Sequence, residues 1–214
     1  MKNKKALLLS LCAIMLVAAT VFGTIAYLTS TDEVTNTFTV GSVAIKLDEA
    51  DVKTDGTYET NHESRVKANE YHLLPGHTYI KDPTVTVLKG SEESYVRMLV
   101  TINEQDDLDA IFAPVGGLPL NQVFGGVSDD WNLVAETENE DNTRTYEFHY
   151  KSTVAAPNAD VVLDDLFESI TVPSTITGTQ LATIADLEIR VEAHAIQADG
   201  FADAGAAWAA FDAE

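Results

Sequence analysis

The chain has 214 residues, of which 34 are acidic and 13 are lysine or arginine, so its formal net charge is -21. This acidity disfavours nucleic acid binding, which needs lysine and arginine side chains to neutralise phosphates. The length fits one folded domain, for which about 100–200 residues is usual.

The N-terminal segment has the three parts of a secretory signal peptide. Lysines precede an uncharged apolar run over residues 6–22, and Thr24 and Ala26 supply small side chains at the -3 and -1 positions of a cleavage site. We therefore expect cleavage between Ala26 and Tyr27. An uncleaved membrane anchor is the alternative, because the apolar run is close to the roughly 18–20 residues that span a bilayer.

Cleavage would leave a mature domain over residues 27–214 with a net charge of -24, because residues 1–26 hold three lysines and no acid. Self-repulsion should keep such a protein soluble, and divalent cations or low pH should relieve it. The only cysteine, Cys12, lies in the signal, so no disulfide, thiolate metal site or cysteine nucleophile is expected in the mature chain. Leu11 is not the small residue that precedes a lipidated cysteine, so we expect no lipid anchor.

The first half of the mature chain is mostly strand-like, apart from a polar stretch over Asp48–Ala68 that reads as a surface loop. Thr84–Leu88 is β-branched, and Tyr95–Ile102 alternates cleanly, with Val96, Met98, Val100 and Ile102 on one face. Thr35–Leu47 also alternates, with a phase change at Gly41-Ser42 that suggests a bulge. Its apolar residues are Phe38, Val40, Val43, Ile45 and Leu47.

The second half predicts a short helix over Asp106–Phe112 and an exposed Gly/Pro-rich connection over Pro114–Gly126. Asp130–Ala135 and Thr143–Lys151 form a predicted hairpin across an acidic tip, and Leu187–Ala195 is the clearest later strand. The hairpin's expected core face consists of Trp131, Leu133, Tyr146, Phe148 and Tyr150. A C-terminal helix is expected where Phe201, Ala204, Trp208 and Phe211 follow helical spacing.

Many short strands with few helices predict a mainly β fold, a two-sheet sandwich with short peripheral helices that include a C-terminal one. Several segments also resemble one family. They are Gly23-Thr24-Ile25-Ala26-Tyr27 with the polar stretch behind it, Leu74-Pro75-Gly76, Lys81-Asp82-Pro83, Tyr95-Val96-Arg97, Ala195–Phe201 and Ala206-Ala207-Trp208.

These segments resemble the TasA/camelysin family of exported Gram-positive surface and biofilm-matrix proteins, whose signal is cut by a dedicated W-type signal peptidase. The resemblance implies a jelly-roll-like topology and a secreted product in the extracellular matrix or at the cell surface. It also implies, for the biofilm-fibre members, assembly by donor-strand exchange, in which a terminal strand of one subunit adds to the sheet of the next.

Camelysin-type members have been described as metalloproteases, which would require histidines spaced as zinc ligands. A zinc protease motif H-E-x-x-H is absent, because His62-Glu63 is followed by Ser64, Arg65 and Val66. Pro75-Gly76 separates His72 from His77, and His149 and His194 fall on outward strand positions, as surface histidines do. There is no nucleophile elbow, phosphate loop or EF-hand pattern either. No catalytic, cofactor-binding or metal-binding residue is assigned, and no enzyme activity is expected.

Three functions remain open. The first is an exported structural protein that forms fibres, with copies of itself or related matrix subunits as partners and a signal peptidase as partner during export. The second is a secreted hydrolase of the camelysin type, and the third is a monomeric binding module of the cell surface. In the first, the membrane is met only through the uncleaved signal, and Phe38, Val40, Val43, Ile45 and Leu47 form the assembly strand.

Overall fold

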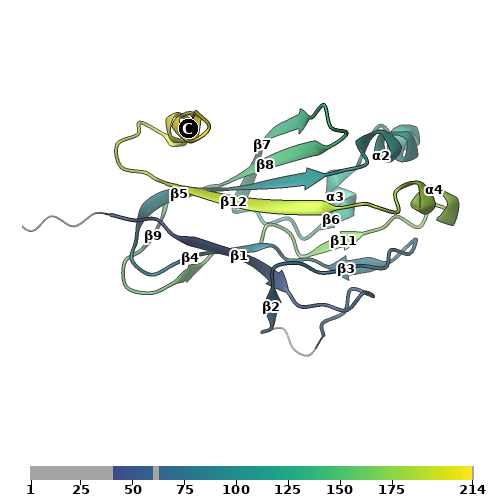
Figure 1. The fold of residues 1–214 in the computed structure, drawn as a ribbon, viewed down its shortest axis with the longest axis horizontal. Coiled ribbons are helices and arrows are strands. Elements are labelled where there is room, and N and C mark those ends of the chain that lie inside the picture. Colours follow the sequence, from purple (N-terminus) through teal and green to yellow (C-terminus); the bar gives the residue numbers. More distant parts are fainter. Residues whose placement is uncertain (1–40, 60–62, 214) are drawn as a thin grey trace, which may run out of the picture. The chain divides into compact units, whose positions relative to one another are not determined.

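The computed structural model describes residues 41–59 and 63–213, and Figure 1 shows their arrangement. The fold is mainly β with short helices, which confirms the predicted class. Its strands are β1 (Ile45–Ala50), β2 (Arg65–Val66), β3 (Thr78–Ile80), β4 (Thr84–Val87), β5 (Ser91–Ile102), β6 (Phe124–Gly125), β7 (Trp131–Glu138), β8 (Arg144–Tyr150), β9 (Val154–Ala156), β10 (Val161–Val162), β11 (Ser169–Thr171) and β12 (Ile189–Gln197).

The helices are short and peripheral, and the predicted helices near residue 106 and at the C-terminus are both present. They are α2 (Gln105–Phe112), the 3₁₀ turn η1 (Ala113–Val115), α3 (Leu120–Val123), α4 (Gly178–Thr183) and α5 (Ala204–Phe211). Among the described residues, no helix is long and apolar enough to cross a membrane.

One layer of the sandwich is an antiparallel sheet in the order β12-β5-β8-β7, with β9 paired to the start of β5. The long strand β5 lies inside this layer, where β12 and β8 cover its two edges. As the alternation predicted, Val96, Met98, Val100 and Ile102 are buried on the inner face of β5. The outer face of the same strand carries Arg97, which is also buried, beneath α5.

The other layer contains two antiparallel sheets, β10-β4-β1-β2 and β3-β11-β6. Only Lys81-Asp82-Pro83 separates β3 from β4, and the segment from β10 to β11 runs antiparallel to both strands. Between the paired stretches, Leu166 N donates to Pro83 O at 3.0 Å and Lys81 N donates to Glu168 O at 3.1 Å. The two sheets are therefore continuous along these strands and form one bent layer.

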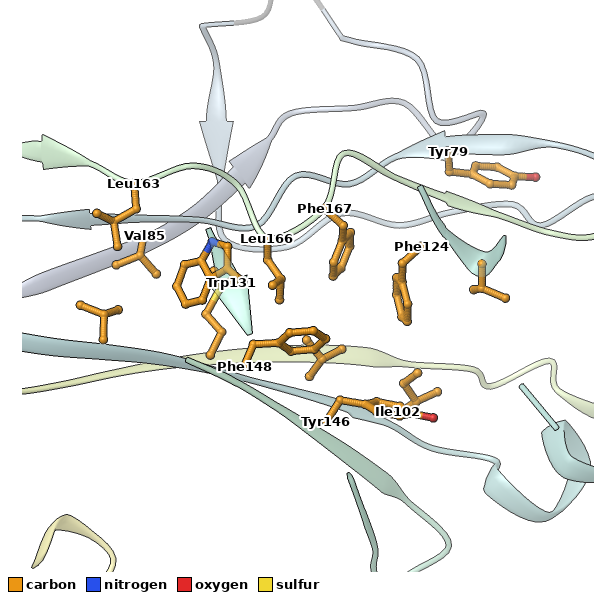
Figure 2. Packing of buried hydrophobic residues seen from close by; sticks show 14 of the residues in the cluster. Tyr79, Val85, Ile102, Phe124, Trp131, Tyr146, Phe148, Leu163, Leu166 and Phe167 are labelled. Atoms are coloured by element: carbon orange, nitrogen blue, oxygen red, sulfur yellow. The ribbon is translucent and has the colours of Figure 1, made fainter. Parts of the chain in front are cut away.

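Aromatic and branched side chains from both layers meet in the core (Figure 2). Tyr146 and Phe148 project from β8, while Phe124, Leu166 and Phe167 come from the opposite layer. The rings of Phe124 and Phe167 are 4.6 Å apart between centroids. Early strands pair with late ones in both layers, β4 with β10 and β5 with β12, as in a jelly-roll-like sandwich.

Three local predictions are wrong. The predicted loop over Asp48–Ala68 begins inside a strand, because Asp48, Glu49 and Ala50 are buried in β1. The connection over Pro114–Gly126 is not wholly exposed, since its last apolar residues, Val123 and Phe124, enter the core. Leu133 is 47% exposed, because β7 extends beyond the opposite layer after Trp131 and has no core to cover.

Candidate functional site

A groove of about 1160 Å³ lies between the two layers along one side of the sandwich. On one layer it is lined by β12 and the residues before it, and on the other by β1 and the connection 67–73. Within the described chain, β12 pairs only with β5, so its outer edge has no strand partner over nine residues. A free strand edge presents unpaired N–H and C=O groups to an incoming chain.

The strand on the other side of the groove, β1, also has an edge that is unpaired over part of its length. β1 pairs with β4 on one side over Ile45–Asp48, but it meets β2 on the other side only at Glu49 and Ala50. Over Ile45–Asp48 that second side has no strand neighbour among the described residues. The groove therefore lies between two sheet edges, the geometry in which a further strand could be added.

Most of the groove lining is apolar, and it includes buried core residues as well as side chains that the rest of the chain buries only partly. The wall residues that argue for an apolar occupant are Tyr71, Leu73, Leu181, Leu187, Ile189 and Val191. Glu70, Glu188 and Arg190 also line the groove, which places charges beside the apolar surface. An extended segment with alternating apolar and polar side chains would match this surface.

A buried ion pair lies at one end of the groove. Lys81 Nζ is 2.5 Å from Glu49 Oε2, and both side chains are only 8% exposed. Asn69 Nδ2 donates to the other carboxylate oxygen, Glu49 Oε1, at 2.9 Å and to Ala50 O at 2.8 Å. The Lys81 ammonium also lies 6.0 Å from the centre of the Tyr71 ring. These partners fix the polar end of the groove.

Arg65 in β2 ties the neighbouring strands together. Its Nε donates to Asp48 Oδ1 at 2.9 Å, its Nη1 to Asp82 Oδ2 at 2.6 Å and its Nη2 to Thr84 Oγ1 at 2.6 Å. Burial raises the pKa of Asp48, but hydrogen bonds from Lys46 and Arg65 outweigh it and hold that pKa below its usual value. The carboxylates of Asp48, Glu49 and Asp82 are therefore each paired with a cation of the same chain.

The predicted assembly residues fall into two groups. Ala26, Tyr27, Phe38 and Val40 lie outside the described residues. Val43 is half-buried just before β1, which spans Ile45–Ala50. The predicted start of the strand at Thr35 lies outside the described residues. Ile45 and Leu47 pack against the chain's own core, where β1 pairs with β4.

A second cluster, which the sequence analysis missed, lies on the outer face of the β12-β5-β8 sheet beneath α5. Arg97, on β5, is 3% exposed. Its Nη1 donates to Glu147 Oε1 at 3.1 Å and to Asp212 Oδ2 at 3.0 Å, and its Nη2 donates to Asp212 Oδ1. Because Asp212 follows Arg97 by 115 residues, only its place just after α5 connects them.

His149 and His194 lie on the outer face of the sheet, as predicted, but they are only partly exposed because α5 packs against them. The ring of His149 is 5.7 Å from that of Trp208, and the ring of His194 is 4.9 Å from that of Phe211. His72 and His77 are exposed, and His62 lies outside the described residues. In the described part of the chain, no three His, Cys, Asp or Glu side chains are grouped as a metal site.

Comparison with known proteins identifies no relative: no family model, no curated protein and no solved structure matches the chain. The resemblance to the TasA/camelysin family therefore rests on the sequence segments named above.

Proposed function

We propose that this protein is an exported structural subunit that assembles with copies of itself, or with related subunits, by strand addition along the groove beside β12. The observation that carries the proposal is the groove itself, because its walls are largely apolar and include Ile189–Val191 at the start of β12, a strand whose outer edge has no strand partner among the described residues. At about 3.3 Å per residue, that edge is roughly 30 Å long, enough for a full strand.

The occupant we propose is the segment that precedes the first described strand. If this segment is extended, every second residue faces the same side. One side would then carry Val34, Phe38 and Val40, with Asn36 as its only polar residue. Processing between Ala26 and Tyr27 would free one end of this segment. Since Ile45 and Leu47 already pack in their own sheet, we restrict the exchanged strand to residues before Gly41.

Head-to-tail addition of this kind does not close on itself, so it produces a filament rather than a dimer. Each copy would offer its groove to the segment of the next copy. Main-chain hydrogen bonds to β12 would supply affinity, and the groove walls would select the register. The products would lie in the extracellular matrix or on the cell surface.

The first experiment compares polymer formation by two purified chains, one beginning at Tyr27 and one beginning at Gly41. We expect filaments in electron micrographs of the longer chain only. Adding a synthetic peptide of residues 27–40 should cap the grooves and slow filament growth. Equal polymerisation by the shorter chain would overturn the proposal.

A substitution in the groove tests the acceptor side. Val191→Glu places a carboxylate among the groove walls, where an added strand would bury it without a partner. We expect growth to slow by at least about tenfold, since a loss of about 1.4 kcal/mol is enough for that change. The matched control is Leu133→Glu, the same kind of change on exposed β7 at the other edge of the same sheet. If both variants slow growth equally, β12 is not the acceptor.

A further inference from the structure

The C-terminal helix covers a buried arginine on the outer face of the β12-β5-β8 sheet. The Arg97 guanidinium lies 4.5 Å from the centre of the Trp208 ring and 5.1 Å from that of Phe211. Trp208 and Ala207 are the buried residues of α5, so the helix uses one face to cover this cation. A cation over aromatic rings is stabilised most where water is excluded.

The end of the helix is tied to the same guanidinium. Asp212 is the C-cap residue of α5, and both of its carboxylate oxygens accept hydrogen bonds from Arg97. The rest of the helix offers little independent stability, because isolated helices shorter than about 12–15 residues are marginal in water. Trp208 Nε1 is buried without a hydrogen-bond partner among the described residues, which further limits the stability of the covered state.

His194 is the remaining partner of Arg97. Arg97 Nε donates to His194 Nδ1 at 3.2 Å. Because arginine is always a donor, Nδ1 must carry a lone pair, and the imidazole must be neutral. Protonation would turn this acceptor into a donor and would place a second cation beside Arg97, directly under the Phe211 ring.

We propose that α5 is an acid-released latch, which protonation of His194 opens to uncover the outer face of β12, β5 and β8. The charged groups that face His194 come from every element of the cluster: Arg97 on β5, Glu147 and His149 on β8, Glu192 on β12 and Asp212 after α5. The Arg97 guanidinium is the group in direct hydrogen-bond contact with the His194 ring, and it repels a charged imidazole.

His149 differs from His194 in its partner. Its Nε2 lies 2.7 Å from Glu147 Oε1, so a protonated His149 would face a carboxylate. Protonating His149 therefore breaks no hydrogen bond to Arg97. This difference assigns the switch to His194 and makes His149 the natural control position.

The direction of the pH effect follows from the difference in the pKa of His194 between the packed and the released state of α5. Burial and then Arg97 lower the pKa of His194 below 6.5 while α5 is packed. Release of α5 would expose the ring to water and remove the first of these causes, so the pKa would rise towards its ordinary value. The released state thus binds the proton more tightly, and acidification below pH 6.5 favours release. Between the two pKa values the ratio of released to packed helix rises by up to about tenfold for each pH unit.

Asp212 reinforces the effect at lower pH. The hydrogen bond from Arg97 lowers the pKa of Asp212 below 3.8 in the packed state. Its protonation therefore also favours release, but only as the pH falls below 3.8. His194 is the group that responds first.

The test follows the two indole N–H resonances by NMR, with a soluble gadolinium chelate added to the purified chain. Trp131 Nε1 donates to Asp164 O at 2.9 Å in the core, whereas Trp208 is on the buried face of α5. A Trp208→Phe variant assigns the two signals. Between about pH 7.5 and about pH 5 we expect the paramagnetic relaxation of the Trp208 signal to rise several-fold while that of Trp131 stays constant.

Two variants decide the outcome. In His194→Gln an amide oxygen can still accept from Arg97 Nε but does not titrate, so the Trp208 response should become flat. His149→Gln should keep the wild-type response. A flat wild-type response, an unchanged response in His194→Gln, or equal exposure of Trp131 would each overturn the latch. The measurement uses the chain that begins at Gly41, which lacks the proposed assembly segment and should stay monomeric on acidification. Failure of the assembly proposal would therefore leave this result unaffected.

Discussion

The ion pair between Lys81 and Glu49 carries two charges that the fold removes from water together. Each side chain is 8% exposed, and their atoms are 2.5 Å apart. Asn69 and the Tyr71 ring complete the surroundings of the pair. A lone buried charge is far more costly than a paired one, so the two residues are stable only as a unit.

Lys81→Met should therefore lower the free energy of unfolding by about 3–5 kcal/mol, because it leaves the Glu49 carboxylate buried and unpaired. Urea denaturation followed by circular dichroism measures the change. The double variant Lys81→Met with Glu49→Gln should recover much of the loss, since neither charge then remains. A single variant as stable as the wild type would show that water reaches Glu49.

At the scale of elements, strands with a strict alternation were predictable and buried charges were not. The pattern of Tyr95–Ile102 located the inner face of β5, because its apolar residues face only the core. Arg97 occupies an outward position in that pattern, and its burial depends on α5, which begins more than a hundred residues later. No local pattern contains that information.

The groove could not be predicted from the sequence for the same reason, because it depends on contacts between distant parts of the chain. Ile189 and Val191 alternate with charged residues in the predicted strand Leu187–Ala195, and both are partly buried and packed against the core. That β12 forms a sheet edge, however, depends on which strands pair with β5. Asp48 and Glu49 were assigned to a loop for a similar reason: their partners Arg65 and Lys81 come from later in the chain.

The cap of α5 gives a prediction for that element. The Asp203 side chain accepts a hydrogen bond from Ala206 N at 2.9 Å and satisfies one of the free N–H groups at the start of the helix. Asp203→Ala should destabilise the packed helix by about 0.5–2 kcal/mol. We expect faster amide hydrogen exchange over Ala204–Phe211 and no change in β5.

The control for this prediction is Asp203→Asn, which keeps the accepting oxygen and removes the charge. It should exchange almost as slowly as the wild type, because asparagine caps helices about as well as aspartate. Faster exchange in both variants would point to the charge rather than to the cap.

At the scale of the whole molecule, acidity should control association. A mature chain with a net charge of -24 repels its copies at neutral pH and low salt. Acidification towards the isoelectric point, which is about 4.3 for the full sequence of 214 residues, or addition of millimolar divalent cations, should promote assembly. Light scattering during both titrations measures this effect.

Monovalent salt distinguishes simple charge repulsion from a specific effect of divalent cations. Screening at about 0.15 M shortens the range of repulsion to roughly 8 Å, so it should promote assembly as well if simple repulsion is limiting. Scattering that stays flat in all three titrations would remove charge as the control of association.

The pairing of β5 with β12 also has a consequence for how the chain folds. The last strand covers most of one edge of β5, from Ser94 opposite Gln197 to Ile102 opposite Ile189. Until residues 189–197 have left the ribosome, β5 has an unpaired edge and the sandwich lacks a strand. Sheets that depend on such distant partners fold in about milliseconds to seconds rather than microseconds. The order of strands thus delays the compact state until nearly the entire polypeptide is available.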